Sequence, residues 1–149
     1  MHFNVTEHPT AQWTAQQVVE ACPWDTAPKY LLRDRDSIYG KVFRNRVTHM
    51  GIKEVISAPK SPWQNPYVER MIGSVRKDCL DYVIVFNENH LKCILTEYFE
   101  YYHFDRTHLG LSKDTPFERL VKNRPKNGEV IAFPRVGGLH HRYEWRKAA

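Results

Sequence analysis

Apolar residues recur at helical spacing in four stretches of the chain. The predicted helices span residues 10–22, 40–50, 67–79 and 88–104. Thr10 is expected to cap the first helix, and a glycine at position 51 is expected to end the second. The buried side of the third helix is predicted to carry Val68, Ile72, Val75 and Cys79. The apolar stripe of the fourth is predicted to consist of Leu91, Leu95, Tyr98 and Tyr102.

Two segments between these helices have the pattern of strands. Residues 29–32 form a short apolar run that ends near Asp34, and residues 52–56 mostly alternate apolar with polar positions. Residues 3–5 are too short for a complete element, and we interpret them as the end of a further strand. Strands that alternate with helices predict an α/β architecture with at least partly parallel strands.

The remaining segments are expected to be irregular. Residues 58–66 hold three prolines and predict a loop. A further helical turn is predicted over residues 116–121, and an extended tail from residue 126 onward.

Composition limits the class of protein. At 149 residues with 42% hydrophobic content, the chain suits one domain with a core, and no apolar run is long enough to cross a membrane. Three cysteines without a CxxC pair indicate reduced thiols in the cytoplasm. The net charge of +5 is concentrated between positions 33 and 77, where ten Lys or Arg face four Asp or Glu. This concentration of positive charge favours a nucleic-acid partner, although a solvated basic surface explains the charge equally well.

The segment 31–37, Leu-Leu-Arg-Asp-Arg-Asp-Ser, places Asp34 at the carboxyl end of a predicted strand. A side chain there projects into the crevice where α/β sheets bind ligands. An aspartate before a turn is also typical of a cap, and this segment alone leaves both interpretations open. Asp36 lies beside Asp34 only if both belong to the strand, and a turn is the alternative.

Glu69 follows the Pro-rich segment and lies in the first turn of the helix 67–79. The helix dipole favours a negative side chain there, so charge capping is one interpretation. At 100° per residue, Gly73 and Arg76 lie within about 40° of Glu69 on the helix wheel. With Lys77 they make a polar, basic and open side, which suits phosphate and metal binding as well as plain solvation.

Two carboxylates on different elements suit divalent metal chemistry. Mg²⁺ and Mn²⁺ prefer carboxylate oxygens, and two ions about 4 Å apart clamp the attacking and leaving oxygens of a phosphodiester. Such centres commonly need three carboxylates or more.

These residues resemble a known family. Asp34 and Glu69 are similar to the second and third acids of the Asp, Asp, Glu triad of retroviral-type integrases and insertion-sequence transposases. Residues 61–70 resemble the active-site loop and helix start of these enzymes, and Arg76 falls where they commonly carry a DNA-contacting basic residue. The resemblance ends in a block made of Tyr101, Tyr102, Arg106, His108, Leu111, Thr115 and Pro116.

The resemblance implies a ribonuclease-H-like α/β fold, with a mixed sheet and flanking helices. It makes residues 3–5, 29–33 and 52–56 the third, fourth and fifth strands, so the chain resembles an integrase core that lacks its first two strands. On this interpretation the catalytic core spans residues 1–121, and residues 122–149 form an extended basic tail.

The resemblance also implies the chemistry. In an intact relative, Asp34 and Glu69 would be catalytic and would bind Mg²⁺ or Mn²⁺ ions that activate water and later a DNA 3′-hydroxyl. Arg76, Lys77 and Lys60 would bind DNA phosphates, and Asn65 would reach a DNA end. The implied partners are transposon ends, target DNA, and either further copies of the chain or a full-length transposase. No membrane is implied.

The family's first acid lies on its first strand, and no residue of this chain matches it. We therefore expect a polynucleotidyl transferase fragment that is inactive in strand transfer alone, unless another chain supplies the missing strands. A catalytically dead DNA-binding or regulatory fragment is the alternative, and an unrelated soluble α/β domain is a third. Four histidines have no spacing that suits zinc, and structural or surface roles are expected for His103, His108, His140 and His141.

Overall fold

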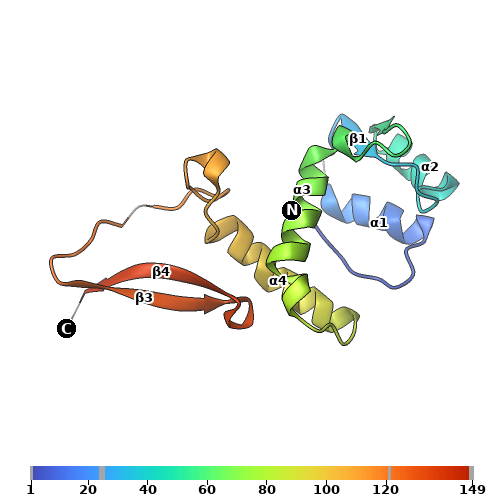
Figure 1. Cartoon of the computed structure of the whole chain (residues 1–149). Helices are drawn as coiled ribbons and strands as arrows, with labels where there is room; N and C mark the ends of the chain where they lie inside the picture. Colours follow the sequence, from blue (N-terminus) through green and yellow to red (C-terminus); the bar gives the residue numbers. More distant parts are fainter. Residues whose placement is uncertain (1, 24–25, 121, 148–149) are drawn as a thin grey trace. The chain divides into compact units, whose positions relative to one another are not determined.

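The structure is a computed structural model, and it describes residues 2–23, 26–120 and 122–147. The chain divides into two compact units, Met1–Gly73 and Ser74–Ala149, each with a two-stranded sheet of its own (Figure 1). The predicted α/β class is confirmed, but the strands belong to two separate sheets. The predicted domain boundary falls at residue 121, which lies outside the described residues.

The first unit contains helix α1 (Ala11–Ala21), strand β1 (Tyr30–Arg33), helix α2 (Lys41–His49) and strand β2 (Lys53–Ile56). These elements match the predicted ones to within about two residues at their ends. Strands β1 and β2 pair in parallel, as predicted. The Thr10 hydroxyl accepts a hydrogen bond from the Trp13 N–H at 3.2 Å and so caps α1.

A small core holds the first unit together. It consists of Ala15 from α1, Phe43 and Val47 from α2, and Ile52 just before β2. Phe43 and Val47 are completely buried. Their spacing of four residues places both on one side of α2, which explains why the predicted helical period marks the packed face.

A glycine sets the turn from α2 into β2. Gly51 has φ +73°, a left-handed conformation that residues with a Cβ rarely adopt. Its N–H donates to the Thr48 carbonyl at 3.0 Å, and the Ile52 N–H donates to the Val47 carbonyl at 3.1 Å. This pair of bonds is the Schellman motif that ends many helices.

Residues 3–5 do not form a strand, so this prediction was wrong. The Val5 N–H donates to the side-chain oxygen of Asn4 at 2.9 Å. Among the described residues no strand pairs with this segment, and a local side-chain bond takes the place of a sheet bond.

Helix α3 (Pro66–Asp78) begins in the first unit and ends in the second. The prediction of its buried side was wrong at two positions, because the side chains of Val68 and Ile72 are exposed. Both line an open pocket instead of a closed core. Cys79, just beyond the helix, is completely buried, as predicted.

The second unit is built on helix α4 (Glu88–Phe104), whose bounds are the predicted ones. The Asn87 side chain accepts the His90 N–H at 2.8 Å and caps the helix. Tyr98 and Tyr102 are buried with Cys79 and Val136. The predicted apolar stripe of α4 therefore faces the core along the C-terminal half of the helix.

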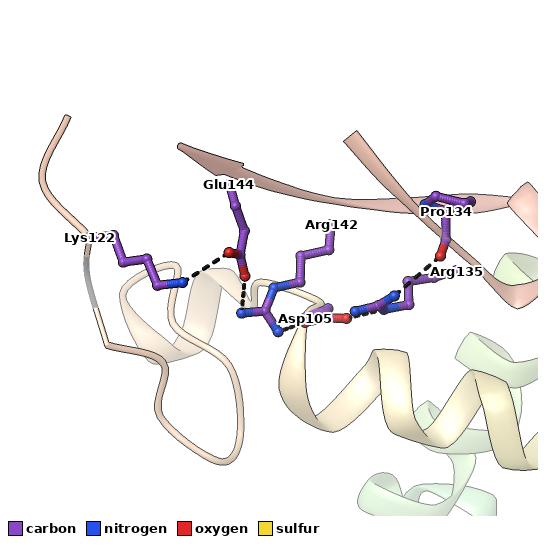
Figure 2. Close-up of polar contacts among 6 residues, drawn as sticks. All are labelled: Asp105, Lys122, Pro134, Arg135, Arg142 and Glu144. Carbon is purple, nitrogen blue, oxygen red and sulfur yellow. Dashed lines mark hydrogen bonds and ion pairs between the residues drawn. The ribbon is translucent and has the colours of Figure 1, made fainter. Parts of the chain in front are cut away.

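The C-terminal segment is extended, as predicted, but it is paired. Strands β3 (Gly128–Arg135) and β4 (His140–Lys147) form an antiparallel hairpin, in which Arg135 lies opposite His140. Figure 2 shows Asp105, at the end of α4, bound to Arg135 at 2.6 Å and to Arg142 at 2.9 Å. The predicted helical turn from residue 116 is a plain turn at residues 116–117, and residue 121 lies outside the described residues.

The ring nitrogens of His103 are buried among aromatic side chains. Its ring packs edge-on against Tyr102 and Phe117, with centroids 5.4 Å and 5.2 Å away. Both ring nitrogens are inaccessible and have no hydrogen-bond partner among the described residues. Burial therefore lowers the pKa of His103 below its usual value.

The depressed pKa predicts acid destabilisation of the second unit. The contribution of the neutral ring is fully present above about pH 6.5 and is lost as the pH falls through the folded-state pKa. Urea denaturation between pH 5 and 8 should show this loss. His103→Phe should reduce the pH dependence, whereas His141→Gln, at an exposed position, should leave it unchanged; equal pH dependence in both variants would contradict the assignment.

Within the described part of the chain, no helix combines the length and the apolar character needed to cross a bilayer.

Candidate active site

The carboxyl ends of β1 and β2 meet at one edge of the parallel sheet, and a pocket of about 730 Å³ opens there. Its walls come from residues 32–39, from the loop 57–62 and from the start of α3. Four of the predicted site residues line this pocket, all from the first unit: Asp34, Lys60, Asn65 and Glu69. The two acids that were predicted from separate segments therefore face one pocket.

Asp34 and Asp36 lie in a turn rather than on the strand. Asp34 Oδ1 accepts the Asp36 N–H at 3.1 Å, and Asp36 Oδ1 accepts the Ile38 N–H at 3.0 Å. Both acids still line the pocket. Asp36 helps to fix the turn, whereas Asp34 Oδ2 has no hydrogen-bond partner among the described residues.

Tyr39 connects the pocket to the core. Its ring contacts Phe43 edge-on at 4.8 Å and lies 5.0 Å from the Arg33 guanidinium. Burial first, and then the charges of Asp34 and Asp36, raise the pKa of the Tyr39 hydroxyl. Tyr39 therefore stays protonated at neutral pH and can donate a hydrogen bond in the pocket.

A buried ion pair supports the floor of the site. Arg33 on β1 bonds to Glu54 on β2 at 2.5 Å, and both side chains are largely buried. Arg33 also donates to the Asp34 carbonyl at 2.8 Å. These contacts hold the backbone at Asp34, directly after β1, in place.

The loop between β2 and α3 is held by one contact within the loop and by one from Arg35, which follows β1. The Ala58 N–H donates to the Gln64 side chain at 2.7 Å, and the Arg35 Nε donates to the Ser57 carbonyl at 3.2 Å. A short 3₁₀ turn (Pro62–Gln64) follows. Lys60 has φ +55°, a strained conformation of a kind that clusters at functional sites.

Glu69 is exposed in the first turn of α3, where its N–H donates to the Asn65 carbonyl at 3.1 Å. A side chain at Gly73 would meet no other atom within 4 Å, so the helix is open one turn further on. Glu69, the acid that lines the pocket, therefore lies on the side of α3 that was predicted to be open.

The other two predicted DNA-binding residues, Arg76 and Lys77, belong to the second unit. Both are exposed in the last turn of α3. Arg76 forms a surface ion pair with Asp81 at 3.5 Å, and pairs of this kind are worth little in water. Arg76 therefore stays available to a polyanion.

Sequence reasoning missed two residues of the pocket, Arg35 and Tyr39. Arg35 has a weak signal, because it separates the two aspartates. Tyr39 has none, since its place follows from packing against Phe43. Two aromatic side chains nearby, Trp63 and Tyr67, are 70% and 87% exposed and were also not singled out.

The acids of this pocket are its candidate metal ligands. No group of three or more His, Cys, Asp or Glu residues suited to a metal ion occurs in the part of the chain that the structure describes. Asp34 and Glu69 offer two carboxylates at one pocket. Mg²⁺ is commonly bound by one or two carboxylates with water and substrate phosphates, so this donor set fits one such ion.

Residues 50–116 match the family model described as an integrase core domain. This match confirms the resemblance over that segment, which includes Lys60, Asn65 and Glu69. Asp34 lies before the matched segment. No curated protein sequence matches the chain.

The fold is similar to a chain in the cryo-EM structure of the simian T-cell lymphotropic virus intasome in complex with the PP2A regulatory subunit B56 gamma. The match has a TM-score of 0.54 at 15% identity and covers 95% of the present chain. The present chain spans about half, 54%, of that protein. The comparisons thus support a mixed α/β fold similar to that of the intasome chain, and an integrase-core match over residues 50–116.

Proposed function

We propose that the chain acts in DNA integration or transposition, as part of an integrase-type catalytic core. The observation that carries the proposal is the placement of Asp34 and Glu69 at one pocket, at the carboxyl ends of two parallel strands. The match of residues 50–116 to integrase cores supports it.

The proposed roles follow from the geometry. Asp34 and Glu69 would hold Mg²⁺ or Mn²⁺, which supplies charge neutralisation at a scissile phosphodiester when it is bound. Arg35 and Lys60, on the pocket wall, would attract the DNA backbone. The protonated Tyr39 hydroxyl would donate to a phosphate oxygen.

Further DNA contacts are assigned to Asn65 in the pocket and to Arg76 and Lys77 on the exposed last turn of α3. The partners proposed are DNA, including transposon ends and target, and further copies of the chain or a full-length transposase. The compartment that fits three unpaired cysteines is the cytoplasm.

A second candidate function is a non-catalytic DNA-binding or regulatory role. The observation that favours it is that no group of three or more His, Cys, Asp or Glu residues in the described part of the chain is arranged to hold a metal ion, although Asp36 also lines the pocket. Two carboxylates fit one ion but not a two-ion centre. We infer that the chain by itself binds one metal ion and does not transfer strands.

Metal binding tests the proposed site. Titration of the chain with Mn²⁺, followed by electron paramagnetic resonance, should show one bound ion. Asp34→Asn and Glu69→Gln should each weaken the affinity about tenfold or more, because each removes a charged ligand. Glu129→Gln, at an exposed position on β3, is the matched control and should bind Mn²⁺ normally.

Two further outcomes separate the candidates. Binding of Mn²⁺ that is insensitive to both acid substitutions would refute the site. Metal-dependent nicking of duplex DNA by the native chain, lost in Asp34→Asn, would favour the catalytic role, whereas metal binding without nicking would favour the regulatory one.

A further inference from the structure

A second pocket, of about 290 Å³, lies within the second unit between the loop after α4 and strand β4. Its walls carry four cations, Lys113, Arg119, Lys122 and Arg142, and two carboxylates, Asp114 and Glu144. The formal balance of +2 favours an anion. Nothing in the proposed catalytic site uses these residues.

The two carboxylates of this pocket are already engaged. Asp114 Oδ1 accepts the N–H groups of Thr115 at 2.7 Å and Arg119 at 3.0 Å, and these bonds lower the pKa of Asp114. Glu144 accepts from Lys122 at 2.9 Å and pairs with Arg142 (Figure 2). Asp114 therefore fixes the backbone of the pocket wall, and Glu144 holds Lys122 and Arg142 in place.

Two buried donors in the same pocket have no partner. The Thr115 residue is 2% exposed, and its hydroxyl makes no hydrogen bond among the described residues. Arg142 Nε is also buried without a partner there, although its other nitrogens bond to Asp105 and Glu144. Buried polar groups are normally hydrogen-bonded, so two unpaired donors on residues that both line this pocket indicate an absent acceptor.

The remaining cations are free to meet that acceptor. Neither Lys113 nor Arg119 forms an ion pair within the described part of the chain. A phosphate group has the acceptor oxygens that such donors require, and charge-assisted bonds to arginine are among the strong ones. Tyr143 and Trp145 line the same pocket and offer aromatic surface beside the cations.

We propose that this pocket binds a phosphate group through the Thr115 hydroxyl, Arg142 Nε and Arg119. Because the proposed function is DNA integration or transposition, we expect the bound phosphate group to belong to a DNA backbone. Only this identification of the ligand rests on the proposed function. The site itself would stand if the metal-binding role of Asp34 and Glu69 failed, because every residue that forms it lies in the second unit.

The test compares Thr115→Val with Thr96→Val in the full chain. Valine keeps the shape of threonine and removes the hydroxyl. Thr96 is the matched control because it is exposed on α4, where its hydroxyl donates to the Lys92 carbonyl. The amide resonance of residue 115 is followed by NMR during titration with inorganic phosphate, with chloride at matched ionic strength as the reference.

The native chain and Thr96→Val should show saturable shifts with phosphate and none with chloride. Thr115→Val should bind phosphate about tenfold more weakly, since a hydrogen bond to a charged group is lost. Arg119→Gln is a second variant and should also weaken phosphate binding. It keeps the contact with Asp114, because the backbone N–H of residue 119 makes that contact. Equal affinity in Thr115→Val and Thr96→Val, or equal shifts with chloride, would overturn the proposal and leave water as the partner of both donors.

The second arm uses a short duplex DNA and fluorescence anisotropy across a range of salt concentrations. If the source is DNA, Arg119→Gln should lower the slope of log affinity against log salt by about 0.9, the value for one phosphate contact. Weaker binding of inorganic phosphate with unchanged DNA binding would establish free phosphate as the ligand and reject the DNA source.

Discussion

Replacing Asp105 with alanine is expected to lower the free energy of unfolding of the second unit by about 3 kcal/mol. The Asp105 side chain is 3% exposed and accepts from Arg135 at 2.6 Å and from Arg142 at 2.9 Å. Its removal leaves two guanidinium groups beside the hairpin without their shared carboxylate (Figure 2). Breaking a buried pair typically costs about 3–5 kcal/mol, and we expect the lower value because the arginines keep some contact with water.

Hydrogen exchange followed by mass spectrometry is the suitable measurement, because it reports on each unit separately. Amides of β3, β4 and the end of α4 should lose protection in Asp105→Ala, and those of α1 and α2 should not. Glu129→Ala removes an exposed acid from β3 and should change the free energy of unfolding by less than about 0.5 kcal/mol. Protection equal to native in Asp105→Ala would show that the hairpin is held by other contacts.

The local elements were predictable from the sequence, because their signals are short-range. The bounds of α4 follow from Asn87 as a cap and from the stripe that contains Tyr98 and Tyr102. The end of α2 follows from Gly51, the residue best suited to the left-handed turn. In each case residues within one or two turns of each other determine the structure.

The pairing of the C-terminal strands was not predictable in the same way. Residues 136–139 join the two strands through a Gly-Gly pair inside a four-residue connection, which is a weaker hairpin signal than a two-residue Asn-Gly or Asp-Gly turn. Their connection is instead a 3₁₀ turn with positive φ at Gly137 and Gly138. The Asp105 ion pairs join residues at least thirty positions apart, which no periodicity can show.

The candidate active site was predictable in part. Asp34 and Glu69 are acids at positions that suit metal binding. The parallel pairing of β1 with β2 places both of them at one pocket. The sequence predicted that Val68 and Ile72 are buried, but both are exposed. Helical spacing identifies an apolar side of a helix and does not show whether another element covers that side. Tyr39 is positioned at the pocket by tertiary packing against Phe43 and Arg33, which no local pattern shows.

Phe43→Ala is expected to have the other large effect, a loss of about 3–5 kcal/mol in the free energy of unfolding of the first unit. Phe43 is completely buried and packs with Ala15, Val47 and Ile52 in a core of very few residues. Removing the ring leaves a cavity in this small core, which destabilises the unit in addition to the lost burial. The substitution also removes the ring that contacts Tyr39 at 4.8 Å, so the wall of the acidic pocket should lose its fixed position.

Two measurements distinguish this expectation from a purely local change. Urea denaturation of Phe43→Ala should show the lower stability, and its affinity for Mn²⁺ should fall although neither acid has been altered. Val42→Ala is the matched control, because Val42 precedes Phe43 on α2 and is 55% exposed. Native stability in Phe43→Ala would mean that the first unit does not depend on this core. A loss of stability with native Mn²⁺ affinity would instead show that metal binding does not depend on the packing of Tyr39. The positions of the two acids would then depend on Arg33 and its ion pair with Glu54.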